Sequence, residues 1–282
     1  MALITLTTDY GTLDYRVAAI KGSIYSQLPD AQIVDITHDI QAYNLLQASY
    51  IIKSAYKYFP EGSVHILGID CFHHEARKNI LAKVDGHFFI CADNGLLSLI
   101  FHDIQPEYIY KITLTPPFGK EINFTPTDIF APVAAHLAKG GLPQVVGNKI
   151  KNIKENKIPR AVFNETEGIL VGEIIYIDNF GNAVSNISKK FFEEKLVGYE
   201  GFDIKFRSFI LGKIGNSYTS IITNWDNEED QHGNASAIFN EHDLIEITIY
   251  KGSINNGAHS LLGLSVGDRV FVEYQKKREA KS

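Results

Sequence analysis

The chain has 282 residues, of which 45% are hydrophobic and 21% charged, and a formal net charge of −6. This composition is typical of a globular protein long enough for two domains, and the absence of a basic run argues against nucleic acid as a partner. No apolar stretch approaches the roughly 20 residues that span a bilayer, so we expect a cytoplasmic protein that contacts no membrane. Two cysteines, Cys71 and Cys91, are too few for a disulfide framework and fit a reducing compartment.

Strand-like and helix-like runs alternate through the first half of the chain. Four apolar, β-branched segments are expected to form strands: residues 2–8, 31–37, 63–69 and 87–92. Two segments carry apolar residues at helical spacing and each stops before a proline: residues 13–28 and 44–59. Residues 127–141 are expected to form a further helix, with Thr127 as N-cap and Gly140 or Gly141 as its stop. This order predicts an α/β domain with a mostly parallel sheet covered by helices.

The second half has a different pattern. The lysine- and asparagine-rich residues 146–164 are expected to form a solvated linker between domains at 1–145 and 165–282. Short alternating runs follow the linker, separated by turn residues: 168–178, 202–211, 244–252 and 268–274. These runs predict a smaller C-terminal domain that is an antiparallel β-barrel.

Polar side chains crowd the segment after the expected strand at 63–69. Residues 68–79 read GIDCFHHEARKN. In open α/β sheets the ligand crevice lies outside the carboxyl ends of the strands, so this position favours a functional site. Zinc takes ligands that usually come from two separated segments, and adjacent residues such as His73 and His74 rarely point at one ion. Since no spaced Cys or His pair occurs elsewhere, we expect no metal site.

Five motifs lie at predicted strand ends or turns: TTDYGTLDY at 7–15, GIDCFHHEAR at 68–77, ADNGLL at 92–97, NFTPTDIFAPVAAH at 123–136 and YIDNFGNAVSNI at 176–187. In this order and spacing the chain resembles the S-adenosyl-L-methionine (SAM) hydroxide adenosyltransferase family, which also contains SAM-dependent fluorinases and chlorinases. The resemblance covers nearly the whole chain. It implies SAM as substrate, no cofactor, and a homo-oligomer, usually a trimer, with SAM between the first domain of one subunit and the second domain of its neighbour.

Seven residues are implied by this resemblance to bind the ligand: Asp9, Asp14, Tyr43, Phe124, Asp178, Asn182 and Asn240. A carboxylate just beyond the first strand, such as Asp9, accepts hydrogen bonds from both ribose hydroxyls. The alternative is that Asp9 only caps the helix that begins near Asp14. Tyr43 corresponds to an aromatic ring against the ligand, and its alternative is ordinary half-buried packing.

Two further ligand contacts are implied in the second domain. The family uses the position of Asp178 for the methionine amino group and that of Asn182 for adenine, since an amine needs a carboxylate and an adenine edge needs an amide. The alternative is that both residues only satisfy a turn at Gly181. Residues 238–252, with Asn240, correspond to the segment that grips adenine and the methionine carboxylate, or form a plain barrel strand.

The expected reaction is hydrolysis of SAM by in-line attack of water at C5′ of the ribose, which gives adenosine and L-methionine. The sulfonium leaves readily, so the protein must mainly orient the water and partly deprotonate it. The family's hydrolases carry an aspartate and an arginine that match Asp70 and Arg77. The third catalytic residue of those hydrolases is a histidine in the sequence FHGRD. This chain reads FTPTD there and has Thr125 at the position of the histidine.

Thr125 cannot act as a base near neutral pH. Either His73 or His74 then supplies the imidazole, or the water-activating network is weakened or lost. In the second case the chain is an adenosine- or SAM-binding protein of the same fold. A halogenase is disfavoured because Pro126 has no N–H for a halide and the charge of Asp70 would repel an anion.

Overall fold

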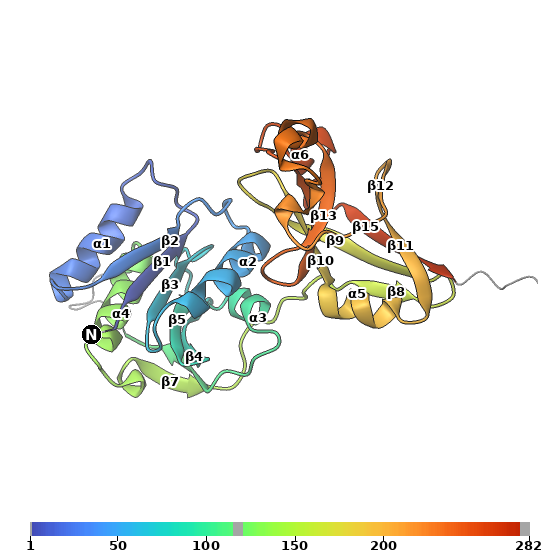
Figure 1. Cartoon of the computed structure of the whole chain (residues 1–282). Helices are drawn as coiled ribbons and strands as arrows, with labels where there is room; N and C mark the ends of the chain where they lie inside the picture. The colour runs from blue at the N-terminus through green and yellow to red at the C-terminus, as the bar shows by residue number, and fades with distance from the viewer. Residues whose placement is uncertain (1, 115–120, 277–282) are drawn as a thin grey trace, which may run out of the picture. The chain divides into compact units, whose positions relative to one another are not determined.

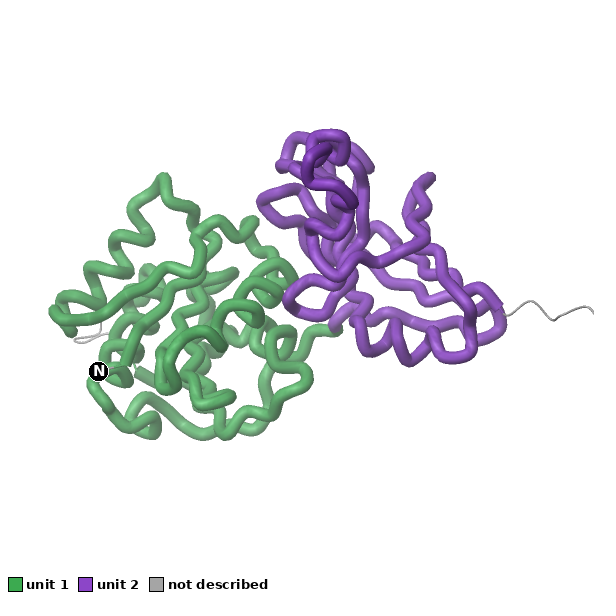
Figure 2. The backbone as a smooth tube through the Cα atoms, in the orientation of Figure 1, with its two compact units in different colours: residues 1–157 green, residues 158–282 purple. Residues whose placement is uncertain are grey.

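The computed structural model describes residues 2–114 and 121–276. The start of the expected first domain, residue 1, and the end of the expected second domain, residues 277–282, therefore lie outside the described ranges. The chain forms two compact units, residues 1–157 and 158–282 (Figure 2). Each unit has its own apolar core.

The first unit is built on a seven-stranded mixed sheet with the order β2-β1-β3-β5-β4-β6-β7 (Figure 1). Its strands are β1 (Ile4–Thr8), β2 (Ile33–Thr37), β3 (Val64–Gly68), β4 (Asn79–Val84), β5 (His87–Ala92), β6 (Tyr108–Ile112) and β7 (Gly147–Ile150). Strands β2, β1, β3 and β5 are mutually parallel, and β4, β6 and β7 pair antiparallel. The expected α/β fold is therefore confirmed, and its parallel part holds the four strands that the sequence predicts.

Helices cover both faces of this sheet. They are α1 (Arg16–Gln27), α2 (Leu45–Ala55), α3 (Leu96–Ile100) and α4 (Ala131–Ala138), with single turns η1 (Tyr56–Tyr58) and η4 (Pro143–Val145). Successive strand residues point to opposite faces, so Ile66 packs in the core under α1 and α4 whereas Leu67 packs in the core under α2 and α3. Strand β3 is buried along its whole length, as its unbroken apolar run predicts.

The last helix of this unit begins earlier than expected. A π-helical turn, η3 (Pro126–Phe130), precedes α4, and Thr125 occupies the N-cap position. The expectation that Thr127 is the N-cap is wrong: its Oγ1 donates to the carbonyl oxygen of Phe124 at 2.9 Å from inside the turn. The reason is the proline after Thr125, which is favoured at the first helical position. Gly140 follows the end of α4 with φ of +85°, as expected for a stop.

The expected linker is partly structured. Its first residues form β7, which pairs with β6 at the edge of the sheet, so residues 147–150 belong to the first unit. Lysine and asparagine side chains are common on edge strands, which explains why this strand reads as a linker. The boundary between the units falls after Lys157, and β8 (Val162–Asn164) begins soon afterwards.

The second unit is an antiparallel sheet with the order β12-β11-β15-β9-β10-β14-β13, with β8 also paired to β9. Its other strands are β9 (Ile169–Ile177), β10 (Ala183–Ser188), β11 (Tyr199–Phe206), β12 (Phe209–Leu211), β13 (Ala235–Phe239), β14 (Leu244–Ile249) and β15 (Arg269–Lys276). Its helices and turns are α5 (Lys189–Leu196), η5 (Tyr218–Ile221), η6 (Trp225–Gln231) and α6 (Ala258–Leu261). A single bridge from Gly215, just after β12, to Ile238 in β13 links the two ends of the sheet, so it is nearly closed, as expected for a barrel.

The topology of the first unit indicates where a ligand-binding crevice is expected. The chain leaves β1 toward β2 on one side, and leaves β3 toward β5 on the other. Thr8 pairs with Gly68, so the residues that follow β1 and β3 emerge side by side. Such a switch point is where α/β sheets bind ligands.

Candidate active site

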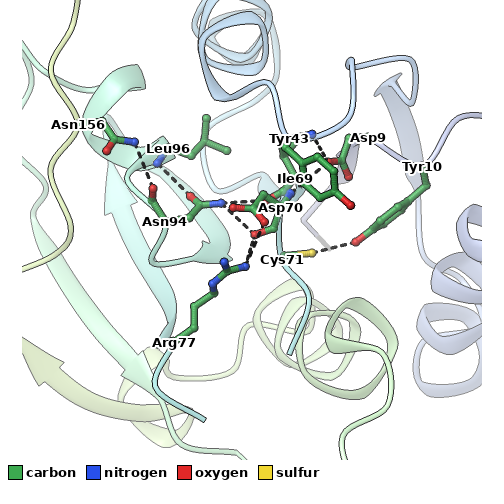
Figure 3. Close-up of polar contacts among 10 residues, drawn as sticks. All are labelled: Asp9, Tyr10, Tyr43, Ile69, Asp70, Cys71, Arg77, Asn94, Leu96 and Asn156. Atoms are coloured by element: carbon green, nitrogen blue, oxygen red, sulfur yellow. Dashed lines mark hydrogen bonds and ion pairs between the residues drawn. The ribbon is translucent and has the colours of Figure 1, made fainter. Parts of the chain in front are cut away.

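Asp9, directly after β1, ties together two loops at this crevice (Figure 3). Its Oδ2 accepts hydrogen bonds from the backbone N–H of Tyr43 at 3.0 Å and of Asp70 at 3.2 Å. Both donors have left-handed backbones, with φ of +65° at Tyr43 and +41° at Asp70. Asp9 does not cap a helix, since α1 begins only at Arg16. No hydrogen bond from the described residues reaches its Oδ1, which leaves that oxygen to accept from a ligand.

Asp70 and Arg77 form a pair at the end of β3. The Arg77 guanidinium donates through Nη1 to the Asp70 carbonyl at 2.7 Å and to its Oδ1 at 3.3 Å. The two side chains are 27% and 31% exposed respectively, so the pair is open to solvent and to a ligand. The structure therefore brings together Asp9, Asp70 and Arg77.

Tyr10 and Cys71 form a neutral wall beside this pair. The Tyr10 hydroxyl and the Cys71 Sγ lie 2.9 Å apart, and the Tyr10 ring packs edge-on against Phe124 with centroids 5.3 Å apart. Burial raises the pKa of the Cys71 thiol to about 12 and also raises the pKa of Tyr10. Both groups are protonated at neutral pH. Tyr10 is not predicted from the sequence, although it stands inside the TTDYG motif.

Thr125 lies at the N-terminus of η3, next to Phe124. It is 1% exposed, and its Oγ1 has no hydrogen-bond partner among the described residues. A buried hydroxyl without a partner is unusual, because it loses its bonds to water and gains none. This oxygen is therefore available to a ligand or a water molecule.

The two adjacent histidines are exposed on the loop that carries the Asp70 and Arg77 pair. The Nδ1 of His74 accepts from the backbone N–H of Ala76 at 3.1 Å, and its carbonyl oxygen accepts from the N–H of Arg77 at 2.9 Å. Neither imidazole forms a direct hydrogen bond with the Asp70 or Arg77 side chain in the described part of the chain. Recruitment of His73 or His74 through a water molecule stays a prediction.

Asp14 and Tyr43, two of the other expected ligand contacts in this unit, are both exposed. Asp14 is exposed and forms an ion pair with Arg16 at the start of α1, so the structure does not join it to Asp9. The Tyr43 side chain is 61% exposed, and its ring lies 6.4 Å from that of Phe72. Tyr43 is more exposed than half-buried packing would give, and the ring contact that it does make is with Phe72.

In the second unit, Asp178 and Asn182 form one hydrogen-bonded turn. The Asp178 carboxylate accepts from the Asn182 backbone N–H at 2.8 Å and from its Nδ2 at 2.9 Å. Asn182 is 4% exposed, and its Oδ1 has no partner among the described residues. The turn geometry at Gly181 is thus satisfied, and one buried amide oxygen remains for a ligand.

Glu246 on β14 completes this polar group and is not predicted from the sequence. Asn240 donates through Nδ2 to its Oε2 at 3.1 Å, and Asn240 Oδ1 in turn accepts from the N–H of His242 and Leu244. Burial raises the pKa of Glu246 to about 7, and the Asp178 carboxylate adds to the rise. The signal in the sequence is a single charged residue within the apolar run LIEITI.

This carboxyl predicts a pH-dependent stability. Its folded pKa is above the ordinary value, so the folded state favours the neutral form, and stability present at low pH is lost as the pH rises through 7. We expect Glu246→Gln, which stays neutral and still accepts from Asn240, to raise the free energy of unfolding at pH 8 by about 2 kcal/mol. Near pH 4 the variant and the wild type should unfold alike.

Urea denaturation at the two pH values measures this difference. The exposed Glu193 on α5 offers the matched control, since it is not among the charges that act on Glu246 and Glu193→Gln should change stability little at either pH. A Glu246→Gln variant that is no more stable than wild type at pH 8 would contradict the raised pKa.

A hollow of about 560 Å³ lies elsewhere in the first unit, between α3, β6 and β7. Asn156 and Ser98 line it, but Asp9, Asp70 and Arg77 do not. The Asp9 and Asp70 carboxylates, the Arg77 guanidinium and the left-handed backbones of Tyr43 and Asp70 meet at the crevice, and none of these residues lines the hollow. We therefore assign the candidate active site to the crevice.

Two models of the SAM hydroxide adenosyltransferase family match the chain. The model of the N-terminal domain matches residues 4–147, and the model of the C-terminal domain matches residues 172–271. The chain belongs to the SAM hydroxide adenosyltransferase family. The matched ranges include every residue of the candidate site in both units, and the resemblance drawn from the motifs is confirmed.

Relatives of this SAM hydroxide adenosyltransferase family member carry two kinds of name. An "(R)-S-adenosyl-L-methionine hydrolase" of Methanocaldococcus jannaschii is 28% identical over 96% of both chains. A "Fluorinase" of Actinopolyspora mzabensis is 25% identical over 70% of this chain and 75% of its own. The crystal structure of an uncharacterized conserved protein from Thermotoga maritima has a TM-score of 0.82 at 25% identity and covers 96% of this chain and 99% of its own.

Metal and membrane features are absent from the described ranges. Within residues 2–114 and 121–276, no group of three or more His, Cys, Asp or Glu side chains is arranged to hold a metal ion. None of the helices in these ranges is long and apolar enough to cross a membrane.

Proposed function

We propose that this protein hydrolyses SAM to adenosine and L-methionine. The observation that carries the proposal is the Asp70 carboxylate beside the Arg77 guanidinium, in a loop that Asp9 ties to the end of β1. The hydrolase names of the relatives support the substrate class. By those names we extend the proposal to SAM of the (R) configuration.

The residues of the first unit support this chemistry. The free Oδ1 of Asp9 accepts from the ribose hydroxyls, which sets C5′ beside the end of β3. Asp70 orients a water molecule and takes a proton from it, while Arg77 holds the carboxylate in place. The water oxygen bonds to C5′ as the C5′–S bond breaks, and the electron pair of that bond leaves with methionine as a neutral thioether.

The second unit carries polar groups suited to the methionine and adenine parts of SAM. Asp178 retains carboxylate lone pairs for the methionine ammonium group. Because Asn182 Nδ2 is held by Asp178, its unpartnered Oδ1 is the atom left to accept from an amino group such as that of adenine. Asn240 belongs to the same polar group.

The protonated states of Tyr10 and Cys71 favour water as the nucleophile. A thiolate attacks an activated carbon readily, but the pKa of about 12 keeps Cys71 as a thiol. Its hydrogen bond with Tyr10 further occupies the sulfur. Alkylation of the protein by SAM is therefore disfavoured.

Product analysis in ¹⁸O-labelled water tests the proposal. The protein is incubated with the (R) and (S) forms of SAM separately, and the products are identified by chromatography and mass spectrometry. We expect one ¹⁸O atom in the adenosine, none in the methionine, and faster turnover of the (R) form. No adenosine from either form would overturn the proposed reaction.

A binding protein is the second candidate, and one observation favours it. Thr125 stands where the family's hydrolases have a histidine, and no imidazole in the described ranges forms a direct hydrogen bond with Asp70. Calorimetry with adenosine and SAM separates the two functions, because a binding protein gives heat with a ligand but no products over hours. We also propose that the protein is cytoplasmic and forms a homotrimer. Sedimentation of the purified protein tests the trimer.

The free hydroxyl of Thr125 leads to a prediction for the reaction. We expect Thr125→Val to lower the turnover of SAM about tenfold, because the hydroxyl that positions water is lost. The same change should raise the free energy of unfolding by about 1 kcal/mol, since it removes a buried group without a partner. Steady-state kinetics and thermal unfolding of one preparation measure both effects. Unchanged turnover in a more stable variant would exclude Thr125 from the mechanism.

A further inference from the structure

Asp70 has a backbone conformation that its own sequence does not favour. A left-handed backbone is disfavoured for residues with a side chain, less so for aspartate than for most, and it persists where surrounding contacts impose it. Asp9 holds the N–H of Asp70, and Arg77 holds its carbonyl oxygen. The Arg77 side chain is 31% exposed, so on the carbonyl side this conformation depends on a contact that solvent can reach.

Asn94 makes further hydrogen bonds to the backbone at Ile69 and Asp70. It follows β5 in the ADNGLL motif and is 3% exposed. Its Nδ2 donates to the carbonyl oxygen of Ile69 at 3.0 Å and to that of Asp70 at 3.2 Å (Figure 3). Its Oδ1 accepts from the N–H of Leu96 at 3.1 Å, so only one orientation of the amide satisfies all three bonds.

Residues 154 and 156 hold the turn that carries Asn94 through hydrogen bonds. Asn156 donates through Nδ2 to the carbonyl oxygen of Asn94 at 3.2 Å, and the N–H of Lys154 donates to Asp93 Oδ1 at 2.7 Å. Gly95 has φ of +94°, and a Cβ there would lie 2.2 Å from the Asn156 Nδ2. The close approach of Asn156 thus favours glycine at 95, and its hydrogen bond holds the backbone of Asn94 in place.

We propose that Asn94 is a positioning residue that holds Asp70 in the conformation required for turnover. It acts through the backbone carbonyls of residues 69 and 70 and does not touch the substrate. The proposal rests on the proposed hydrolysis of SAM, in which Asp70 is the catalytic carboxylate.

A double-mutant cycle tests the kinetic part. Asn94→Asp keeps the shape but points an oxygen at two carbonyl oxygens, and Asn94→Ala serves if the aspartate variant does not fold. We expect either change to lower kcat at least tenfold with KM changed less than threefold, because positioning of a general base is lost. In the Asp70→Asn background the same change should have no further effect. Equal losses in both backgrounds would overturn the proposal.

Hydrogen exchange gives a readout that needs no activity. We expect amides in residues 68–77 to exchange at least tenfold faster in Asn94→Ala than in wild type. The matched control is Ser54→Ala, which removes a part-buried hydrogen bond to the carbonyl oxygen of Tyr50 in α2 and contacts neither residues 69 and 70 nor the turn that carries Asn94, so exchange in residues 68–77 should stay as in wild type. If wild type does not hydrolyse SAM, the proposed function fails, and the exchange data alone decide the positioning. Unchanged exchange in Asn94→Ala overturns it.

Discussion

Asp70→Asn is expected to lower kcat for SAM hydrolysis by about 100-fold to 10,000-fold, the range for loss of a general base. The amide keeps the size of the carboxylate but cannot take a proton from water. Asparagine also tolerates the left-handed backbone, so the contacts of residue 70 with Asp9, Arg77 and Asn94 through main-chain atoms should survive. Adenosine affinity should change less than threefold.

Kinetics, calorimetry with adenosine and thermal unfolding together check this result. The ion pair with Arg77 is about a third exposed, so its loss should cost less than about 1 kcal/mol of stability. Asp39→Asn is the matched control, because Asp39 is an exposed carboxylate just after β2. Turnover of the Asp70→Asn variant within threefold of wild type would remove Asp70 from the mechanism.

Asp9→Asn is expected to weaken adenosine binding about tenfold to 100-fold and to lower kcat as well. One oxygen of Asp9 accepts from the strained residues Tyr43 and Asp70, and charge-assisted bonds of this kind are about twice as strong as neutral ones. An amide must either turn its NH₂ toward these two donors or present it to the ribose. Both orientations lose a contact, so binding and turnover fall together.

The pattern of the two effects distinguishes the aspartates. Asp70→Asn should change kcat alone, whereas Asp9→Asn should change the adenosine dissociation constant and kcat in one variant. Calorimetry with adenosine measures the first quantity without turnover. Wild-type adenosine affinity in Asp9→Asn would show that the ribose does not bind at this carboxylate.

Local sequence patterns were sufficient for the parallel part of the sheet and its first two helices. Strands β1, β2, β3 and β5 are short runs rich in apolar and β-branched residues, and α1 and α2 end before prolines, so neighbouring residues alone specify them. Strands β4, β6 and β7 lie on the other side of the sheet and carry lysines and a mixed pattern. Pairing with a neighbouring strand creates them, and a local pattern cannot report that pairing.

The candidate site divides in the same way. The types and the chain order of its residues were determined by the sequence, because the motifs around Asp9, Asp70 and Asp178 identify the family without coordinates. Which of these residues meet was decided only by tertiary structure. Asp9 joins Tyr43, 34 residues away, and Asp70, 61 residues away, because β1 and β3 are adjacent parallel strands.

Proximity in sequence was a poor guide to the rest of the site. His73 lies three residues from Asp70 but stands on an exposed turn, whereas Asn94, 24 residues on, contacts its carbonyl oxygen. Glu246 looks like an ordinary strand residue until β14 pairs with β10 and buries it near Asp178. The sequence by itself thus determined the fold class, the family and the carboxylates; burial and strand pairing, which depend on distant segments, decided which groups hold them and how they ionise.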